Sequence, residues 1–129
     1  MEKTQINPWA WQDRAGFSQA WSVEGAQKVI FVSGQASISA EGAVVGEGDF
    51  EAQTRQVFEN LRTVLNRAGA DFDSIVKITV YLTDISRLPE FGRIKAGYIE
   101  GPQPASTAVG VSALALPGMM IEVEATAVV

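Results

Sequence analysis

Histidine and cysteine are both absent from this chain of 129 residues. Without histidine, the chain cannot build a Ser-His-Asp triad, an imidazole base or a His-ligated zinc site. Without cysteine, it has no disulfide and no thiol nucleophile, which fits a reducing compartment. Proton transfer in any reaction would therefore fall to carboxylates, lysines or the two tyrosines.

Long apolar runs and an excess of basic charge are missing too. No segment approaches the ~20 apolar residues of a membrane span, and Met1–Asn7 lacks the basic-then-apolar order of a signal peptide. We therefore expect a cytoplasmic protein without a membrane partner. The 10 Lys and Arg residues against 15 Asp and Glu give a net charge of -5 at pH 7. That charge argues against nucleic-acid binding, which relies on Lys and Arg to neutralise phosphates.

The composition that remains is typical of one globular domain. Hydrophobic residues make up 47% of the chain and charged residues 19%, and a chain of this length can bury a core. It contains no internal repeat, low-complexity stretch or dividing linker. We therefore expect a single domain over residues 1–129.

Hydrophobic periodicity predicts an α+β domain with the element order β-β-α-β-α-β-β. The expected strands, alternating or rich in β-branched residues, are 17–23, 28–33, 76–83, 105–114 and 119–129. A glycine-rich loop with a short hairpin is expected over 34–48. Stripes at three- and four-residue spacing predict a helix from Asp49 to just before Gly69, and a second helix after Ser86. Asp49 suits the N-cap of the first helix, and Gly69 suits its end.

The connections between these elements predict how the sheet is covered. A crossover between strands should be right-handed, so both helices can lie on one face of the sheet. The second face has no helix to cover it, although several strands, 28–33 among them, are apolar on both sides. Self-association through that face is the simplest way to bury it.

Six short motifs occur in the order in which one protein family has them. They are Ala15–Ala20, Ser33-Gly34-Gln35, the helix segment Gln53–Ala70, the strand Ile75–Asp84, the stretch Pro104–Val109 and the strand Ile121–Ala125. Each motif is weak alone. Together they span nearly the whole chain and resemble the reactive intermediate deaminase (Rid, or YjgF-like) family, also called endoribonuclease L-PSP-like.

The resemblance implies a chorismate-mutase-like subunit with two helices on one face of a mixed sheet. It also implies a homotrimer whose three sheets form a barrel, with a small-molecule ligand bound in a cleft at each subunit boundary. Well-known members of the family hydrolyse enamine and imine intermediates to keto acids and ammonium. They need neither a metal nor an organic cofactor, so none is expected here.

Five candidate site residues follow from the resemblance. Glu122 resembles a carboxylate that positions water, and Ser33 resembles a cleft-lining serine, so both are candidate catalytic residues. Phe17 stands where the family has a tyrosine, Gly92 where it has an asparagine, and Ser106 where an arginine grips the substrate carboxylate. Replacing a guanidinium with a hydroxyl would cost ~1.5–3 kcal/mol or more of carboxylate recognition. Imines of ordinary amino acids are therefore expected to be poor substrates.

Structural roles compete with these functional ones. Arg14 and Arg93 lie near the altered positions and could replace the missing cation, or could simply be solvated at the surface. Glu122 lies on a strand face where it could be solvated, and backbone groups could satisfy the Ser33 hydroxyl. The small side chains around Ser106 could serve tight packing.

Three functions remain open from the sequence. The first is a trimeric hydrolase that acts on a neutral or aromatic enamine or imine. The second is a noncatalytic trimer that binds a ligand or regulates a partner. The third is endoribonuclease activity, which the missing histidine, the net charge of -5 and the lack of a basic cluster interleaved with aromatics all disfavour.

Overall fold

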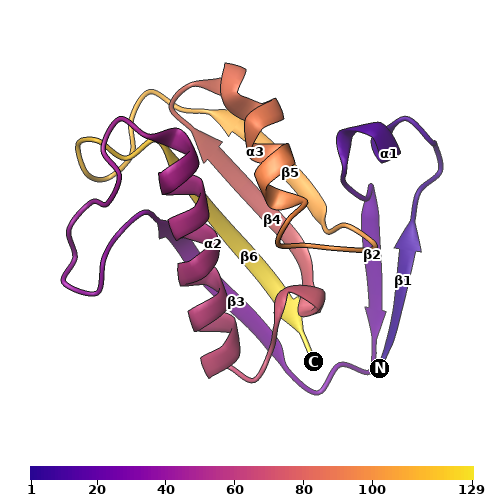
Figure 1. Ribbon diagram of the computed structural model, residues 1–129. Coiled ribbons are helices and arrows are strands. Elements are labelled where there is room, and N and C mark those ends of the chain that lie inside the picture. Colours follow the sequence, from indigo (N-terminus) through magenta and orange to yellow (C-terminus); the bar gives the residue numbers. More distant parts are fainter.

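A computed structural model describes residues 1–129 as a four-stranded sheet with a two-stranded hairpin beside it (Figure 1). Across the main sheet the strands follow the order β3 (Val29–Ala36), β6 (Ile121–Val128), β4 (Ile75–Leu82) and β5 (Ala105–Gly110). β6 runs antiparallel to both of its neighbours, and β4 runs parallel to β5. The predicted α+β class with a mixed sheet is confirmed.

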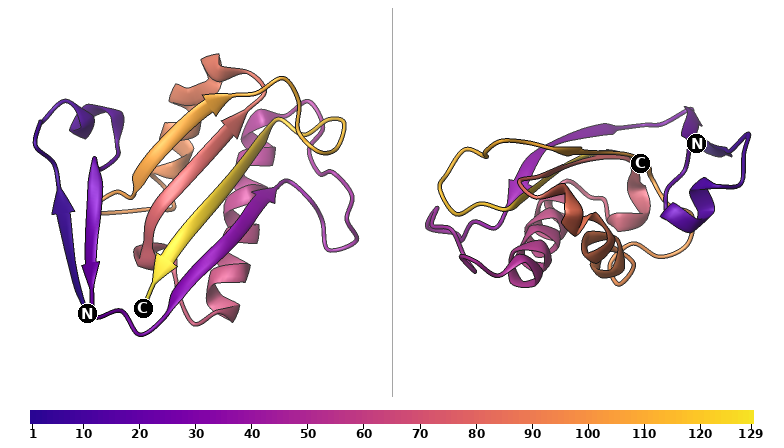
Figure 2. Two further views of the ribbon diagram at one scale, coloured as in Figure 1. Left: turned by 180° about the vertical axis from the view of Figure 1, so that it is seen from behind. Right: turned by 90° about the horizontal axis from the view of Figure 1, so that it is seen from above.

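Two helices, α2 (Phe50–Arg67) and α3 (Leu88–Lys95), cover the same face of the sheet (Figure 2). The side chain of Asp49 accepts a hydrogen bond from the Ala52 N–H at 3.0 Å, which caps α2 as predicted. Gly69 follows the last turn of α2 and has a φ of 80°. Its left-handed backbone conformation ends the helix where the sequence predicted. No helix in the structure is both long enough and apolar enough to cross a membrane.

The core lies between these helices and the inner face of the sheet. Its completely buried side chains include Val57, Phe58, Leu61 and Leu65 of α2 and Ile78, Val80, Leu82, Ile121 and Val123 of the sheet. The ring of Phe58 stacks on Tyr98 at 4.7 Å and on Phe91 at 5.9 Å, measured between centroids. Each fully buried side chain of this size stabilises the fold by roughly 1.5–3 kcal/mol.

The hairpin is the main feature that the sequence did not predict. It pairs β1 (Glu2–Ile6) with β2 (Ala20–Glu24), and the one-turn helix α1 (Gln12–Ala15) lies between the two strands. β1 was missed, and β2 begins three residues after the start of the predicted strand 17–23. β5 ends at Gly110 rather than at residue 114, because its partner β4 ends at Leu82, opposite Gly110.

The uncovered face of the sheet is more polar than predicted. It carries Lys77, Thr79 and Tyr81 from β4 and Glu122, Glu124 and Thr126 from β6. Large exposed apolar side chains occur mainly on the edge strand β3, at Val29 and at Phe31, which is 81% exposed. The prediction that several strands are apolar on both sides was therefore wrong except for β3.

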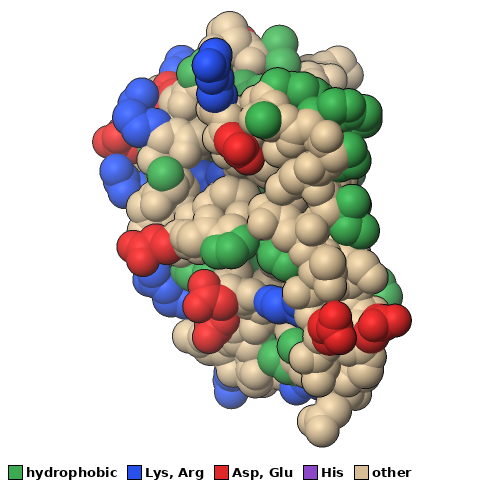
Figure 3. Space-filling view, turned by 90° about the vertical axis from the view of Figure 1, so that its right-hand side faces the viewer, with side chains coloured by type: hydrophobic (Ala, Val, Ile, Leu, Met, Phe, Trp, Pro, Cys, Tyr) green, Lys and Arg blue, Asp and Glu red, His purple; other side chains and the backbone are tan.

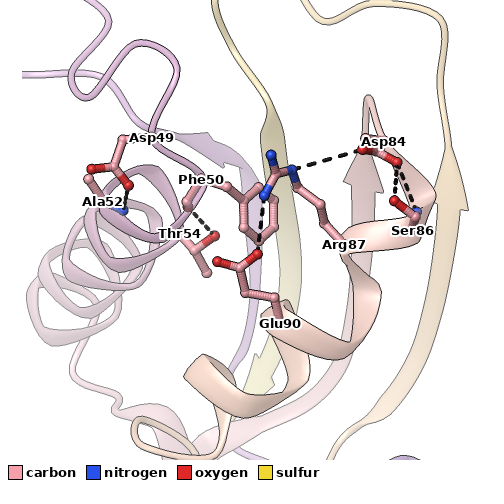
Figure 4. Close-up of polar contacts among 8 residues, drawn as sticks. All are labelled: Asp49, Phe50, Ala52, Thr54, Asp84, Ser86, Arg87 and Glu90. Atoms are coloured by element: carbon pink, nitrogen blue, oxygen red, sulfur yellow. Dashed lines mark hydrogen bonds and ion pairs between the residues drawn. The ribbon is translucent and has the colours of Figure 1, made fainter.

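Arg87 connects the start of α3 to the start of α2 (Figure 4). Its Nη1 lies 3.2 Å from Glu90 Oε2, its Nε lies 3.9 Å from Asp84 Oδ2, and its guanidinium lies 5.3 Å from the centre of the Phe50 ring. Asp84 accepts hydrogen bonds from the hydroxyl and the backbone N–H of Ser86, and these bonds lower the pKa of Asp84. These contacts hold the start of α3 against the start of α2. They therefore help to set the position of the residues along α3.

Candidate functional site

The structure divides the seven candidate site residues between opposite sides of the subunit. Glu122 and Ser33 lie toward the β3 edge of the sheet. The other five lie toward β5. Arg14 is in α1, Phe17 is on the loop after α1, Gly92 and Arg93 are in α3, and Ser106 is in β5. Two strands, β6 and β4, separate these edges (Figure 1).

Glu122 lies over a bulge in the edge strand. The pairing of β3 with β6 shifts register between Val32 and Gln35, which places Ser33 and Gly34 in the irregular segment. A Cβ built on Gly34 would lie only 2.0 Å from Oε1 of Glu122. Only glycine therefore leaves room for this carboxylate in this position.

The two glutamates on the uncovered face of β6 have different surroundings. Glu124 accepts a hydrogen bond of 2.8 Å from the hydroxyl of Tyr81. That hydrogen bond, together with desolvation and the charges of Glu124 and Glu122, raises the pKa of Tyr81. Glu122 is half-buried, yet its carboxylate makes no hydrogen bond or ion pair within the chain. Of the two carboxylates, that of Glu122 is therefore the one without a partner in the chain.

Glu122 and Gly34 line a cavity of about 690 Å³, which we call the β3-side cavity. Its other walls come from β3, the loop after it, α2 and the loop before β6, with Gln35, Ala36, Asn60, Leu116 and Met119 among them. Asn60 holds the loop in place by donating from Nδ2 to the backbone carbonyls of Ala36 and Ile38, both at 2.9 Å. Ser33 does not line this cavity, and its side chain is exposed beside the bulge.

Phe17 is held beside β5 by the hairpin. The N–H of Ser18 donates to the carbonyl of Pro104 at 3.0 Å, and Nε1 of Trp21 donates to the carbonyl of Gln103 at 2.9 Å. The ring of Phe17 meets Trp11 edge-on, with centroids 5.7 Å apart. Viewed from the hairpin side, hydrophobic side chains gather toward the upper right of the surface (Figure 3). The rings of Phe17 and Trp11 make this side of the site aromatic.

Ser106 and Glu122 lie on opposite faces of the sheet. Ser106 pairs with Ile78, whose side chain is completely buried under the helices, so Ser106 points toward the helix layer. Glu122 pairs with Tyr81 on the uncovered face. Two strand spacings, roughly 10 Å, also separate β5 from β6. Within one subunit, these two residues cannot bind the same small ligand.

A second cavity, of about 570 Å³, lies between α1 and α3, and we call it the α1–α3 cavity. It brings together Arg14, Gly92 and Arg93, but neither Phe17 nor Ser106 lines it. A fourth residue of this cavity, Lys95, was not predicted as a site residue.

Lys95 is only 6% exposed, and its Nζ donates to the carbonyl of Gly16 at 2.6 Å. Burial lowers the pKa of the Lys95 ammonium. A signal for this burial was present in the sequence. Lys95 follows the core residue Phe91 by four positions, which places both on one face of α3.

The sequence profile of the Endoribonuclease L-PSP family matches residues 10–129. The chain belongs to this family. The assignment drawn from the six sequence motifs is thereby confirmed.

Three known proteins are similar to this member of the Endoribonuclease L-PSP family. A RutC family protein of Pyrococcus abyssi is 39% identical over 98 residues, which cover 76% of each chain. The 2-iminobutanoate/2-iminopropanoate deaminase of Rattus norvegicus is 37% identical over 112 residues, 87% of this chain and 79% of the rat protein. The crystal structure of the Rid family protein YyfB from Yersinia pestis, whose function is unknown, superimposes over the full length of both chains with a TM-score of 0.89 and 35% identity.

The structure of this family member contains no cluster of three or more acidic side chains that could hold a metal ion. The two cavities described above offer one free carboxylate on the β3 side and three basic side chains between α1 and α3. The first suits water activation, and the second suits anion binding.

Proposed function

We propose that the protein is a homotrimer that binds a small imine or enamine in clefts between subunits and hydrolyses it without a cofactor. In each cleft the β3 side of one subunit would face the β5 side of the next. The supporting observation is that Glu122 and Ser106 lie on opposite faces of one subunit, so that only a contact between unlike surfaces can unite them. Repeated about a threefold axis, such a contact closes into a ring.

The free carboxylate of Glu122 over the Gly34 bulge is the observation that carries this proposal. Glu122 would orient a water molecule and take its proton while the oxygen adds to the carbon of the C=N bond. Backbone N–H groups of the bulge and the Ser33 hydroxyl would stabilise the charge that develops on the substrate. Glu122 would return the proton to the nitrogen, which gives a neutral carbinolamine. As the C–N bond breaks, the hydroxyl proton would pass to the nitrogen, so that ammonia leaves and a carbonyl product remains.

The β5 side of the cleft sets the substrate range. Ser106 offers one neutral hydroxyl, so it cannot form the paired charge-assisted hydrogen bonds with which an arginine binds a carboxylate. Phe17 and its neighbour Trp11 add an aromatic wall. A neutral or aromatic imine therefore suits this cleft better than the imine of an ordinary amino acid.

A noncatalytic trimer that binds a ligand or regulates a partner is the second candidate. The same Ser106 favours it, because a subunit that no longer grips a substrate carboxylate can retain the scaffold and a ligand without turnover.

The substitutions Glu122→Gln and Glu124→Gln form a matched pair that tests the role of Glu122. Both keep the size of the side chain and remove one charge from the same strand face. We expect Glu122→Gln to abolish turnover or ligand binding with a nearly unchanged melting temperature, and Glu124→Gln to do much less. Equal and negligible effects of both substitutions on turnover would leave the noncatalytic trimer as the better account.

Assembly is tested separately by Phe31→Asp. The exposed Phe31 ring lies on the uncovered face of β3, and burying such a ring stabilises an interface by roughly 1.5–3 kcal/mol. Light scattering should show a trimer for the wild type and smaller species for Phe31→Asp, with an unchanged circular dichroism spectrum. Val45→Asp, at an exposed valine of the loop before α2, is the control and should remain trimeric. A monomeric or dimeric wild type would eliminate the intersubunit cleft.

A further inference from the structure

The α1–α3 cavity has an unusual balance of charge. Arg14, Arg93 and Lys95 are three of its lining residues, and no acidic residue lines it. None of the three forms an ion pair, although the chain carries 15 Asp and Glu residues and a net charge of -5. Three basic groups therefore share one cavity without a counter-ion from the protein.

The helix dipole explains only part of this arrangement. Arg93 and Lys95 lie in the last turn of α3, where positive charge is favourable. A lysine in that position gains the same interaction when it extends into solvent, so the dipole does not account for the burial of Lys95. Burying an ammonium group costs free energy unless an anion or several acceptors compensate it, and the single acceptor within the chain is the Gly16 carbonyl.

Gln103 supplies a second, independent observation at this cavity. Its Nε2 donates to the backbone carbonyls of Ile99 and Gly101, at 2.8 and 3.2 Å. Its Oε1 is buried and has no donor within the chain, and Gln103 lines the same cavity. The cavity thus presents several donors with positive charge and one acceptor that lacks a partner.

We propose that the α1–α3 cavity is a binding site for a small dianion that also carries a hydrogen-bond donor, the chemistry of a hydrogen phosphate or of a hydroxylated dicarboxylate. The anion would lie between Lys95 and the two arginines, and a rotation of the Gln103 amide would bring its buried Oε1 within reach of the anion's O–H. Its lining residues come from α1, α3 and the segments beside them, and Glu122 is not among them. The site is therefore tested separately from turnover at Glu122.

Inorganic phosphate is the first probe, with malate as the dicarboxylate arm and acetate as the monoanion control, all at equal ionic strength. Isothermal titration calorimetry should show that phosphate, malate or both bind the wild type at least about tenfold more tightly than acetate does. The double variant Arg14→Gln/Arg93→Gln and the variant Lys95→Met should each lose at least about tenfold in affinity for the bound dianion.

Two control variants show whether the loss of affinity is specific to this cavity. Arg62→Gln removes an exposed arginine that pairs with Glu59 on α2, and it should bind the dianion like the wild type. Glu122→Gln should also bind normally, whatever it does to turnover. Because the buried Lys95 could be needed for folding, the double arginine variant decides the matter. A wild type that binds neither dianion, or wild-type affinity in the double variant, would overturn the proposal.

Discussion

Replacing Gly34 with alanine would move the Glu122 carboxylate without changing any charge. The new Cβ would lie 2.0 Å from Oε1, 2.7 Å from Cδ and 2.9 Å from Cγ of Glu122. The whole end of the side chain must therefore rotate away, not only one oxygen. Gly34 is not among the glycines with positive φ, so its backbone can accept alanine without strain.

The expected effect on stability is small because two contributions oppose one another. Forcing Glu122 out of its preferred rotamer costs about 0.5–1.5 kcal/mol. Alanine restricts the unfolded chain and so contributes about 0.4–1 kcal/mol in favour of folding. The free energy of unfolding should change by less than about 1 kcal/mol, which corresponds to a shift in melting temperature of less than about 4 °C.

The expected effect on function is much larger. A catalytic group displaced by about 1 Å can lose about 100-fold in rate, and here the carboxylate must move further than that to clear the Cβ. Steady-state kcat/KM with a neutral imine measures the loss, or ligand affinity where there is no turnover. Differential scanning fluorimetry on the same samples measures stability.

Gly97→Ala is the matched control for this experiment. Its Cβ would meet only the Ile94 carbonyl, at an ordinary 3.4 Å, and Gly97 lines neither cavity. It should leave function unchanged and leave stability equal or slightly higher. Wild-type activity in Gly34→Ala would refute the reasoning, because it would mean that the observed position of the Glu122 carboxylate is not the functional one.

Three further predictions concern other parts of the molecule. Ser106→Arg should raise kcat/KM for 2-iminobutanoate, measured as ammonia release, by at least about tenfold, because the new guanidinium can pair with the substrate carboxylate. No gain would count against the role assigned to this position. Arg87→Met should lower the free energy of unfolding by about 1 kcal/mol in urea titrations, since it loses two acidic partners and the Phe50 ring; an unchanged midpoint would show that these contacts are neutral. Burial lowers the pKa of Lys95, which shares its cavity with Arg14 and Arg93, below its ordinary value of 10.5. Between the two pKa values the unfolded chain binds more protons than the folded chain, so stability should rise with pH. Lys95→Met should remove that rise, and binding of the dianion should weaken over the same pH interval.

Local signals account for the parts of the fold that the sequence predicted well. The start and end of α2 follow from Asp49 and Gly69, and β4 follows from a two-residue alternation that the structure preserves. β1 had no such signal. All five of its residues are exposed, and pairing with β2 rather than burial of an apolar face holds it in place.

The candidate site was only partly predictable, since its layout depends on long-range order. The motifs point to Glu122 and Ser106 as candidate positions, but that these lie on opposite faces follows from the strand order β3-β6-β4-β5 and its register. Lys95 was overlooked because a lysine in the last turn of a helix is usually solvated. Its spacing from Phe91 was the sign of burial, and Gly16, which accepts its hydrogen bond, lies 79 residues away in the chain.

The hairpin is joined to the rest of the subunit by few contacts, and none of its residues belongs to the hydrophobic core. Its links include the Ser18 N–H to Pro104, the Trp21 indole to Gln103 and the Lys95 ammonium to Gly16. It can therefore open as a unit of low local stability while the sheet stays intact, and its amide hydrogens should exchange with solvent sooner than those of β4 and β6. Because the hairpin carries Arg14 and Gly16, each opening also removes one wall of the α1–α3 cavity. A dianion bound there would slow amide exchange across the first two strands, and this cavity would link ligand binding to the motion of the N-terminal segment.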